Sequence, residues 1–144
     1  MSPKAKVLVA EDELDIRNLI VFSLEYAGYT VVQATDGEEA IQKAITEQPD
    51  LVLLDVRMPR LNGYEACQRL KAHESTHHIP IVFLSARGQE IEIKQGLELG
   101  AVEYILKPFA PDELQQRVAS LLARIKSKPD KRLTSPGVES NEPR

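Results

Sequence analysis

Three carboxylates, a hydroxyl and an amine stand at the ends of short apolar runs in this sequence. Glu11 and Asp12 follow the run KVLVA, and Asp55 ends the run LVLLD. Ser85 ends the run IVFLS, and Lys107 follows EYIL. An ionised carboxylate at the end of a buried strand is costly unless a positive charge pairs with it. Asp55 therefore needs a cationic partner.

Together these five side chains could receive a phosphoryl group. Like charges raise one another's pKa, so three carboxylates in one crevice require a cation. Hard oxygen ligands suit Mg²⁺, which commonly bridges protein carboxylates to phosphoryl oxygens. Lys107 would add a fixed positive charge and Ser85 a hydroxyl, which makes Asp55 a candidate nucleophile. No separate general base is needed, because this carboxylate is already anionic and positioning and charge do most of the work.

Five short apolar runs must position these residues, and each behaves as a strand of a parallel sheet. Runs this short and apolar are typical of strands that helices cover on both faces, which indicates a doubly wound α/β domain. Sites in such sheets form at the carboxyl ends of the strands, near the point where the strand order reverses. The predicted strands are Lys6–Ala10, Thr30–Ala34, Leu51–Leu54, Ile81–Leu84 and Glu103–Leu106.

Helices are predicted in the gaps between these strands. The first is ended by Gly28, the second ends near Pro49, and the fifth starts at Pro111. The third spans residues 64–72, and the fourth spans residues 90–99 with a glycine after its last turn. The apolar stripes of the first, second and fifth helices consist of Ile16, Leu19, Ile20 and Leu24; Ala40, Ala44 and Ile45; and Leu114, Val118, Leu121 and Ile125.

Length and composition fit one folded domain. The chain has 144 residues, 42% of them hydrophobic, so one core is expected over residues 1–126, followed by a disordered polar tail over residues 127–144. The net charge of −4 and the pI of about 5.4 argue against direct nucleic-acid binding. No apolar run approaches the roughly 20 residues that span a bilayer, and Cys67 is the only cysteine. A cytoplasmic protein without a membrane partner is expected.

Four motifs in this order resemble the receiver domain of two-component response regulators, in particular the stand-alone, chemotaxis-regulator-like form. They are Glu11-Asp12, the run DVRMPRLNG from Asp55 to Gly63, LSA at residues 84–86, and YILKPF at residues 104–109. The resemblance covers about residues 5–126. It implies a flavodoxin-like three-layer sandwich whose five parallel strands have the order 2-1-3-4-5.

The resemblance also implies a role for each site residue. Asp55 would accept a phosphoryl group from a phosphohistidine on a sensor histidine kinase or a histidine phosphotransfer protein. Asp12, Asp55 and the main-chain carbonyl of Arg57 would bind Mg²⁺ directly, and Glu11 would act mostly through metal-bound water. Lys107 would pair with Asp55 first and with the phosphoryl oxygens afterwards.

A switch is implied next to this site. Ser85 would hydrogen-bond the phosphoryl group, and Tyr104 would swing inward as the loop of Ser85 moves. This would shift the surface formed by the fourth helix, the fifth strand and the fifth helix, where a downstream protein of unknown identity would bind. Ser85 replaces the commoner threonine but keeps the hydroxyl. Arg57 and Arg87 would flank the phosphoryl group, and we hypothesise that at least one of them alters its lifetime or meets an acidic partner.

The same surface suggests a weak homodimer. In the transcription-factor branch of the family, acids before the aromatic residue of the fifth strand meet arginines of the fifth helix across a symmetric dimer. Glu103 and Glu113 with Arg117 would be the matching set here, although Val102-Glu103 replaces the acidic pair often found before the aromatic residue.

Simpler interpretations exist for single residues, and other enzymes share part of the pattern. Asp55 and Ser85 could be turn or cap residues, Tyr104 could pack half-exposed, and Cys67 could be a packing or a surface thiol. A hydrolase of the haloacid dehalogenase type also phosphorylates an aspartate, but needs an acid where Arg57 stands. In a flavin-binding protein of this strand order, the acidic first loop would repel the flavin phosphate. Convergence of the five polar side chains favours the receiver, which catalyses only its own phosphorylation and dephosphorylation.

Overall fold

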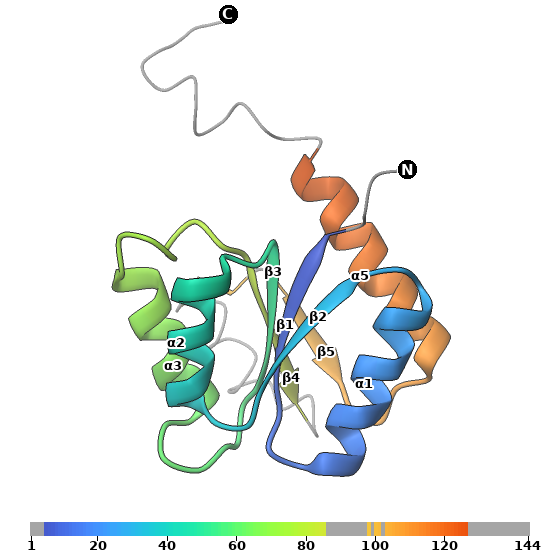
Figure 1. The fold of residues 1–144 in the computed structure, drawn as a ribbon, viewed down its shortest axis with the longest axis horizontal. Coiled ribbons are helices and arrows are strands. Elements are labelled where there is room, and N and C mark those ends of the chain that lie inside the picture. Colours follow the sequence, from blue (N-terminus) through green and yellow to red (C-terminus); the bar gives the residue numbers. More distant parts are fainter. Residues whose placement is uncertain (1–4, 86–97, 99, 102, 127–144) are drawn as a thin grey trace, which may run out of the picture.

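The structure is a computed structural model that describes residues 5–85, 98, 100–101 and 103–126. Within these residues, five parallel strands form one sheet in the order β2-β1-β3-β4-β5, as predicted (Figure 1). Arg87, the polar tail over residues 127–144 and, apart from Glu98, the helix predicted over residues 90–99 lie outside the described residues. The elements are β1 (Lys6–Ala10), α1 (Leu14–Tyr26), β2 (Thr30–Ala34), α2 (Gly37–Glu47), β3 (Leu51–Asp55), α3 (Gly63–Ala72), β4 (Ile81–Ser85), β5 (Glu103–Leu106) and α5 (Pro111–Lys126).

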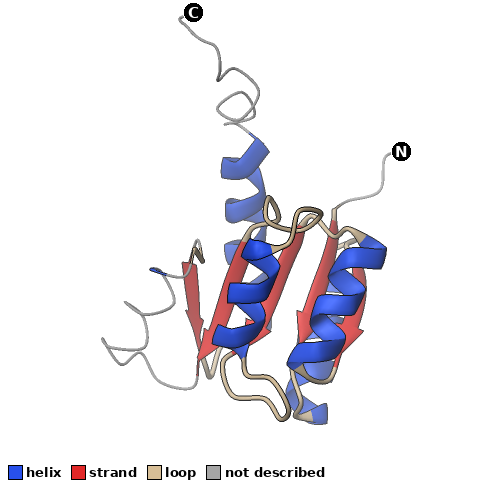
Figure 2. Ribbon diagram, turned by 90° about the vertical axis from the view of Figure 1, so that its left-hand side faces the viewer, coloured by secondary structure: helices blue, strands red, loops and turns tan. Residues whose placement is uncertain are grey.

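Helices cover both faces of the sheet, so the molecule has the three layers expected of this fold (Figures 1 and 2). Successive strand residues point to opposite faces, and both faces are apolar. On one face Leu8 and Phe83 belong to the core that α2 and α3 close, and on the other Val9 and Leu84 belong to the core that α1 and α5 close. These four side chains have no exposed surface, so the middle of the sheet is anchored on both sides.

The start of α3 is defined by its capping residues. Asn62 accepts a hydrogen bond from the backbone N–H of Glu65 at 2.9 Å, and the Glu65 carboxylate accepts one from the N–H of Asn62 at 3.1 Å. This reciprocal pair satisfies two of the N–H groups that a helix leaves unbonded at its beginning. The helix therefore begins at a fixed point, shortly after the strand that ends at Asp55.

The apolar stripe predicted for α1 is correct in part. Ile20 and Leu24 are fully buried, but Leu19 is 38% exposed. Leu14, Phe22 and Tyr26 are also exposed, and the rings of Phe22 and Tyr26 stack with their centroids 6.1 Å apart. The part of the apolar stripe of α1 that is buried in the core is narrower than the spacing of the apolar residues suggests. An apolar surface remains on the outside of this helix.

An ion-pair network joins β5 to α5, and it contains residues that were predicted to form a dimer interface. Glu103 pairs with Arg117 and with Arg124 of the same chain, and Arg117 also donates to the carbonyl oxygen of Tyr104 at 2.8 Å. Glu113 instead accepts a hydrogen bond from the N–H of Ala110 at 3.4 Å, at the start of α5. Two of the residues assigned to a dimer thus pair within one chain, and the dimer itself stays a prediction.

Cys67 is a packing thiol rather than a surface thiol. It lies on α3 without exposed surface, and burial raises the pKa of the thiol to about 11. We expect Cys67 to react with a disulfide reagent at pH 8 far more slowly than in the urea-unfolded chain, because the folded thiol is both covered and protonated. Since only the unfolded thiol ionises between its ordinary pKa of 9.0 and about 11, the free energy of unfolding should decrease as the pH rises through that window. Equal reactivity in native and unfolded protein would contradict this placement.

No described helix is long and apolar enough to cross a membrane.

Candidate functional site

The polar residues predicted from the sequence meet at the carboxyl edge of the sheet. The strand order reverses at β1, whose neighbours are β2 and β3, and Glu11 and Asp12 leave the sheet at this point. Asp55 and Ser85 are the last residues of β3 and β4, one residue beyond the predicted ends, and are paired with Leu84 and Leu106. The next residue after Leu106 is Lys107. Four adjacent strand ends therefore bring these side chains to one edge.

Lys107 joins two buried carboxylates. Its Nζ atom donates a hydrogen bond to Oδ1 of Asp55 at 2.8 Å and lies 2.9 Å from Oε1 of Glu11. The side chain of Glu11 has no exposed surface, and those of Asp55 and Lys107 are 7% and 13% exposed. This is the cationic partner that Asp55 requires at the end of an apolar strand. The contact with Glu11 was not predicted, because the sequence does not show how far the lysine reaches.

One oxygen of this cluster lacks a hydrogen bond. Although Oε1 of Glu11 is close to the lysine, no donor of the described residues reaches it with hydrogen-bond geometry. Its other oxygen accepts a hydrogen bond from the N–H of Glu13 at 3.2 Å. Asp12 is exposed, and one ligand atom from each of Glu11, Asp12 and Asp55 lies within 4.8 Å of the others. A buried carboxylate oxygen without a donor, beside two further carboxylates, is suited to a cation with hard oxygen ligands.

The electrostatics of the site follow from its burial. Burial raises the pKa of Asp55 to about 6; the hydrogen bond from Lys107 opposes this rise, and the charges of Glu11 and Asp12 add to it. For Lys107 burial acts to lower the pKa, but the hydrogen bond to Asp55, the close contact with Glu11 and the charges of both carboxylates outweigh it, so the net shift is upward. The lysine thus remains charged, and Asp55 ionises less readily than an exposed aspartate but carries its charge at pH values above about 6.

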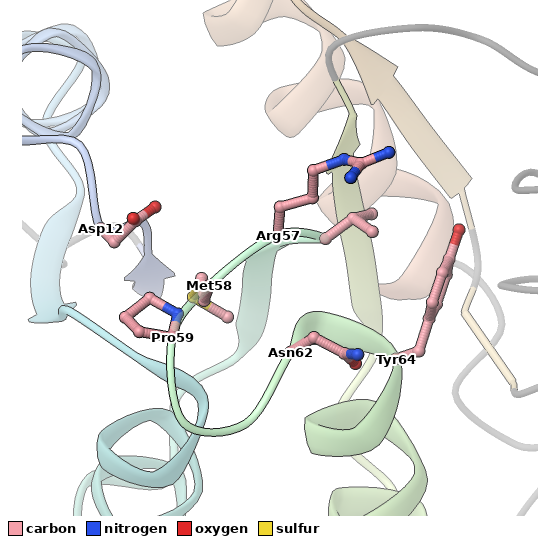
Figure 3. Close-up of a pocket in the computed structure, with 7 residues that line it drawn as sticks. Asp12, Arg57, Met58, Pro59, Asn62 and Tyr64 are labelled. Atoms are coloured by element: carbon pink, nitrogen blue, oxygen red, sulfur yellow. The ribbon is translucent and has the colours of Figure 1, made fainter.

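A cavity of about 600 Å³ opens beside this cluster (Figure 3). Asp12 borders it, and its far side is formed by the loop after β3 and the start of α3. Arg57 is an exposed residue on that loop. Gly63 allows the loop to return closely, because a Cβ atom there would lie 2.3 Å from the carbonyl oxygen of Asp55. The lining residues are Asp12, Val56, Arg57, Met58, Pro59, Asn62 and Tyr64.

Ser85 and Tyr104, the two predicted switch residues, are both buried. Ser85 is 2% exposed, and its carbonyl oxygen accepts a hydrogen bond from the N–H of Lys107 at 2.7 Å. Tyr104 is 8% exposed, so the alternative that it packs half-exposed on an outer strand is wrong. Its hydroxyl lies 2.9 Å from the hydroxyl of Tyr64, a contact between residues 40 positions apart that was not predicted. The position of Tyr64 directly after Gly63, at the site edge, was the only available signal.

Comparison with protein families places most of the chain in one of them. Residues 7–119 match the model of the response regulator receiver domain. The alkaline phosphatase synthesis transcriptional regulatory protein PhoP of Bacillus subtilis is 46% identical over 119 residues, which are 83% of this chain and 49% of that protein. The phosphate regulon transcriptional regulatory protein PhoB of Pseudomonas aeruginosa is 43% identical over 118 residues, 82% of this chain and 52% of that protein. This chain thus spans about half the length of these curated relatives.

Solved structures with the same fold support this match. The chemotaxis response regulator CheY4 of Vibrio cholerae has a TM-score of 0.77 and 32% identity, with 81% of this chain and 98% of that chain covered. The receiver domain of the sensor histidine kinase PA1611 of Pseudomonas aeruginosa, described with a magnesium ion coordinated in its active-site cleft, has a TM-score of 0.77 and 30% identity over 83% of this chain and 98% of that chain. The chain belongs to the response regulator receiver domain family.

Proposed function

We propose that this receiver domain accepts a phosphoryl group on Asp55 in a Mg²⁺-dependent reaction and thereby changes a surface that a partner protein reads. The observation that carries the proposal is the arrangement around Lys107, which lies 2.8 Å from Asp55 and 2.9 Å from Glu11 at the edge of the sheet. The arrangement also includes three acidic residues, Glu11, Asp12 and Asp55, whose ligand atoms lie within 4.8 Å of one another. Fold similarity alone would not assign these roles.

The donor set of the site fits Mg²⁺. Asp12 and Asp55 would provide direct carboxylate ligands, the main-chain carbonyl of Arg57 a third oxygen, and Glu11 would act through water. The magnesium ion described for the PA1611 receiver domain supports this assignment. When bound, Mg²⁺ would supply positive charge that favours ionised Asp55 and neutralises phosphoryl oxygens.

The transfer step needs little from the protein besides position and charge. A carboxylate oxygen of Asp55 forms a bond to phosphorus while the bond from phosphorus to the donor breaks, which is a P–N bond in phosphohistidine and a P–O bond in acetyl phosphate. The donor's nitrogen or oxygen leaves with the bonding electrons. Lys107 then donates hydrogen bonds to the phosphoryl oxygens, and Ser85 offers its hydroxyl. Hydrolysis by water later restores Asp55, so the chain catalyses its own phosphorylation and dephosphorylation.

A sensor histidine kinase or a histidine phosphotransfer protein would be the donor. Such a protein must bring its phosphohistidine to the edge of the sheet where Asp55 lies. A hollow of about 350 Å³ next to Lys107 is lined by Ile16 and Leu19 of α1, by Phe109 and by neighbouring residues. Phe22 and Tyr26 are exposed side chains three and seven residues after Leu19, so they lie on the same side of the helix. They support docking of a partner that buries apolar side chains beside the phosphoacceptor.

Downstream, phosphorylation would act through Ser85 and Tyr104 on the surface that contains β5 and α5. The two transcriptional regulators to which the chain is similar suggest one context for this output, while the net charge of −4 gives no support for direct nucleic-acid binding by this chain.

Residues 1–126 would form the receiver domain and residues 127–144 a polar tail, in a cytoplasmic protein. A weak homodimer through the β5 and α5 surface and an effect of Arg57 or Arg87 on the phosphoryl lifetime remain part of this proposal.

Incubation with acetyl phosphate tests the proposal through the intact mass of the protein. We expect a gain of one phosphoryl group in Mg²⁺ and no gain in EDTA, because without a divalent cation the described part of the site offers the incoming phosphoryl group three carboxylates and one buried lysine. Ca²⁺, which prefers more ligands at longer distances, is the control for a non-specific effect of divalent charge. Equal uptake in EDTA and in Mg²⁺ would contradict the assigned role of the metal.

A further inference from the structure

Three aromatic rings from three different elements pack together beside the site. Tyr64 of α3, Phe83 of β4 and Tyr104 of β5 form this cluster. The ring centroid of Phe83 lies 5.1 Å from that of Tyr64 in an edge-to-face arrangement and 5.4 Å from that of Tyr104. Phe83 has no exposed surface and Tyr104 is 8% exposed, whereas Tyr64 is half-buried. The cluster therefore runs from the cavity wall into the core.

The two tyrosine hydroxyls meet at the edge of this cluster. They lie 2.9 Å apart, so one donates a hydrogen bond to the other. A buried phenol ring contributes apolar contact, but its hydroxyl must keep a hydrogen-bond partner when the ring leaves water. Tyr64 provides such a partner at the position where the ring of Tyr104 is buried.

The two ends of this contact are attached to different parts of the molecule. The carbonyl oxygen of Tyr104 accepts a hydrogen bond from Arg117 of α5 at 2.8 Å, and β5 pairs with β4, so the backbone of Tyr104 is held by contacts that do not involve its ring. Tyr64 follows Gly63, whose N–H donates to the carbonyl oxygen of Val56 at 2.8 Å. The backbone from which the Tyr64 side chain extends is thus held next to the loop that follows Asp55.

We propose that Tyr64 is a positioning residue for Tyr104, whose hydroxyl holds the Tyr104 ring in its buried position and ties that position to the loop after Asp55. The position of the Tyr104 ring then depends on Tyr64 as well as on Ser85. A displacement of the β3 end reaches β5 through α3 as well as through β4. The consequence for signalling rests on the proposed function, whereas the contact between the two tyrosines can be tested without any phosphoryl donor.

Nitration of tyrosine by tetranitromethane, under conditions that modify each molecule at most once, tests this role. If Tyr104 reacts only while its ring is exposed, its nitration rate is proportional to the fraction of molecules in which the ring is exposed. In Tyr64→Phe, which keeps the ring and removes the hydroxyl, we expect Tyr104 to be nitrated about fivefold faster, a factor that corresponds to about 1 kcal/mol for one hydrogen bond. Peptide mass spectrometry separates the sites of reaction.

Two controls separate this effect from a general loss of stability. Tyr29 is 9% exposed and belongs to the core on the other face of the sheet, so under native conditions its nitration reports local fluctuations of that face and should be unchanged in Tyr64→Phe. Tyr26 is 80% exposed, and Tyr26→Phe should leave the rate at Tyr104 unchanged. An unchanged rate at Tyr104 in Tyr64→Phe, or an increase that Tyr29 shows equally, would overturn the proposal. Neither result would contradict the proposed phosphorylation of Asp55, which is tested separately.

Discussion

Replacing Asp55 by asparagine is expected to abolish phosphoryl uptake from acetyl phosphate while the protein stays folded. The amide has no anionic oxygen to form the bond to phosphorus. It also removes a carboxylate whose pKa burial raises to about 6, so the change relieves rather than adds an unfavourable charge at neutral pH. Lys107 retains Glu11 as its partner in this variant. Intact mass after incubation in Mg²⁺ measures the effect, and urea unfolding verifies the fold.

The matched control is Asp15→Asn, which removes the same charge from an exposed position in the first turn of α1. It should take up a phosphoryl group at the wild-type rate, because Asp15 is not among the residues whose ligand atoms gather at the site. Full uptake by Asp55→Asn would mean that another residue is the acceptor.

Replacing Lys107 by methionine should produce the largest loss of stability among the site variants. The change keeps the aliphatic part of the side chain but leaves Asp55 and Glu11 buried without their cation. Removing one partner of a buried ion pair typically costs roughly 3–5 kcal/mol. We expect a loss of about this size in the free energy of unfolding at pH 8 without divalent cations, measured by urea unfolding. Lys43→Met removes a cation from an exposed pair with Glu39 and should cost about 0.5 kcal/mol or less.

The loss in Lys107→Met should depend on pH with a defined sign. The pKa of Asp55 lies near 6 in the folded chain against an ordinary value of 3.8, so the folded state holds this proton more tightly. The contribution of this group to stability is thus present below 3.8 and is lost as the pH rises through about 6. Without the lysine the folded pKa rises further, so the variant should be less impaired at pH 5 than at pH 8. A loss that is the same at both values would contradict the charge argument.

The sheet could be predicted almost completely from the sequence because each strand is a short apolar run with a clear end. The bounds of β1, β2 and β5 agree with the prediction, and β3 and β4 each extend by one residue. Those two residues, Asp55 and Ser85, are polar, and apolar patterning does not distinguish the last strand residue from the first loop residue. Whether Asp55 and Ser85 are the last strand residues or the first loop residues, both lie at the carboxyl edge of the sheet, so the predicted site was not affected.

Side-chain partners were predicted less well, because they depend on reach and rotamer rather than on pattern. Lys107 was expected to meet Asp55, but its contact with Glu11 follows from burial of both strand ends. The hydrogen bond between Tyr64 and Tyr104 requires β4 and β5 to stand in a particular register, which places Phe83 opposite Tyr104. No spacing in the sequence encodes that register.

Periodicity was also insufficient for α1. The stripe that includes Leu19 has the spacing of a core face, yet the adjacent α5 covers only part of it. Which apolar residues of a helix remain exposed depends on where its neighbours end. We propose a docking role for the exposed side of α1 because of its position beside Lys107, which the sequence alone does not show.

The most direct test that Asp55 is the phosphoacceptor is to locate the phosphoryl group after chemical trapping. Borohydride reduces an aspartyl phosphate to homoserine, so the acceptor is identified in a peptide digest without inference from a mutant. After incubation with acetyl phosphate and Mg²⁺, we expect homoserine at position 55 and at no other aspartate. Conversion at Asp12 or another acid, with Asp55 unmodified, would contradict it.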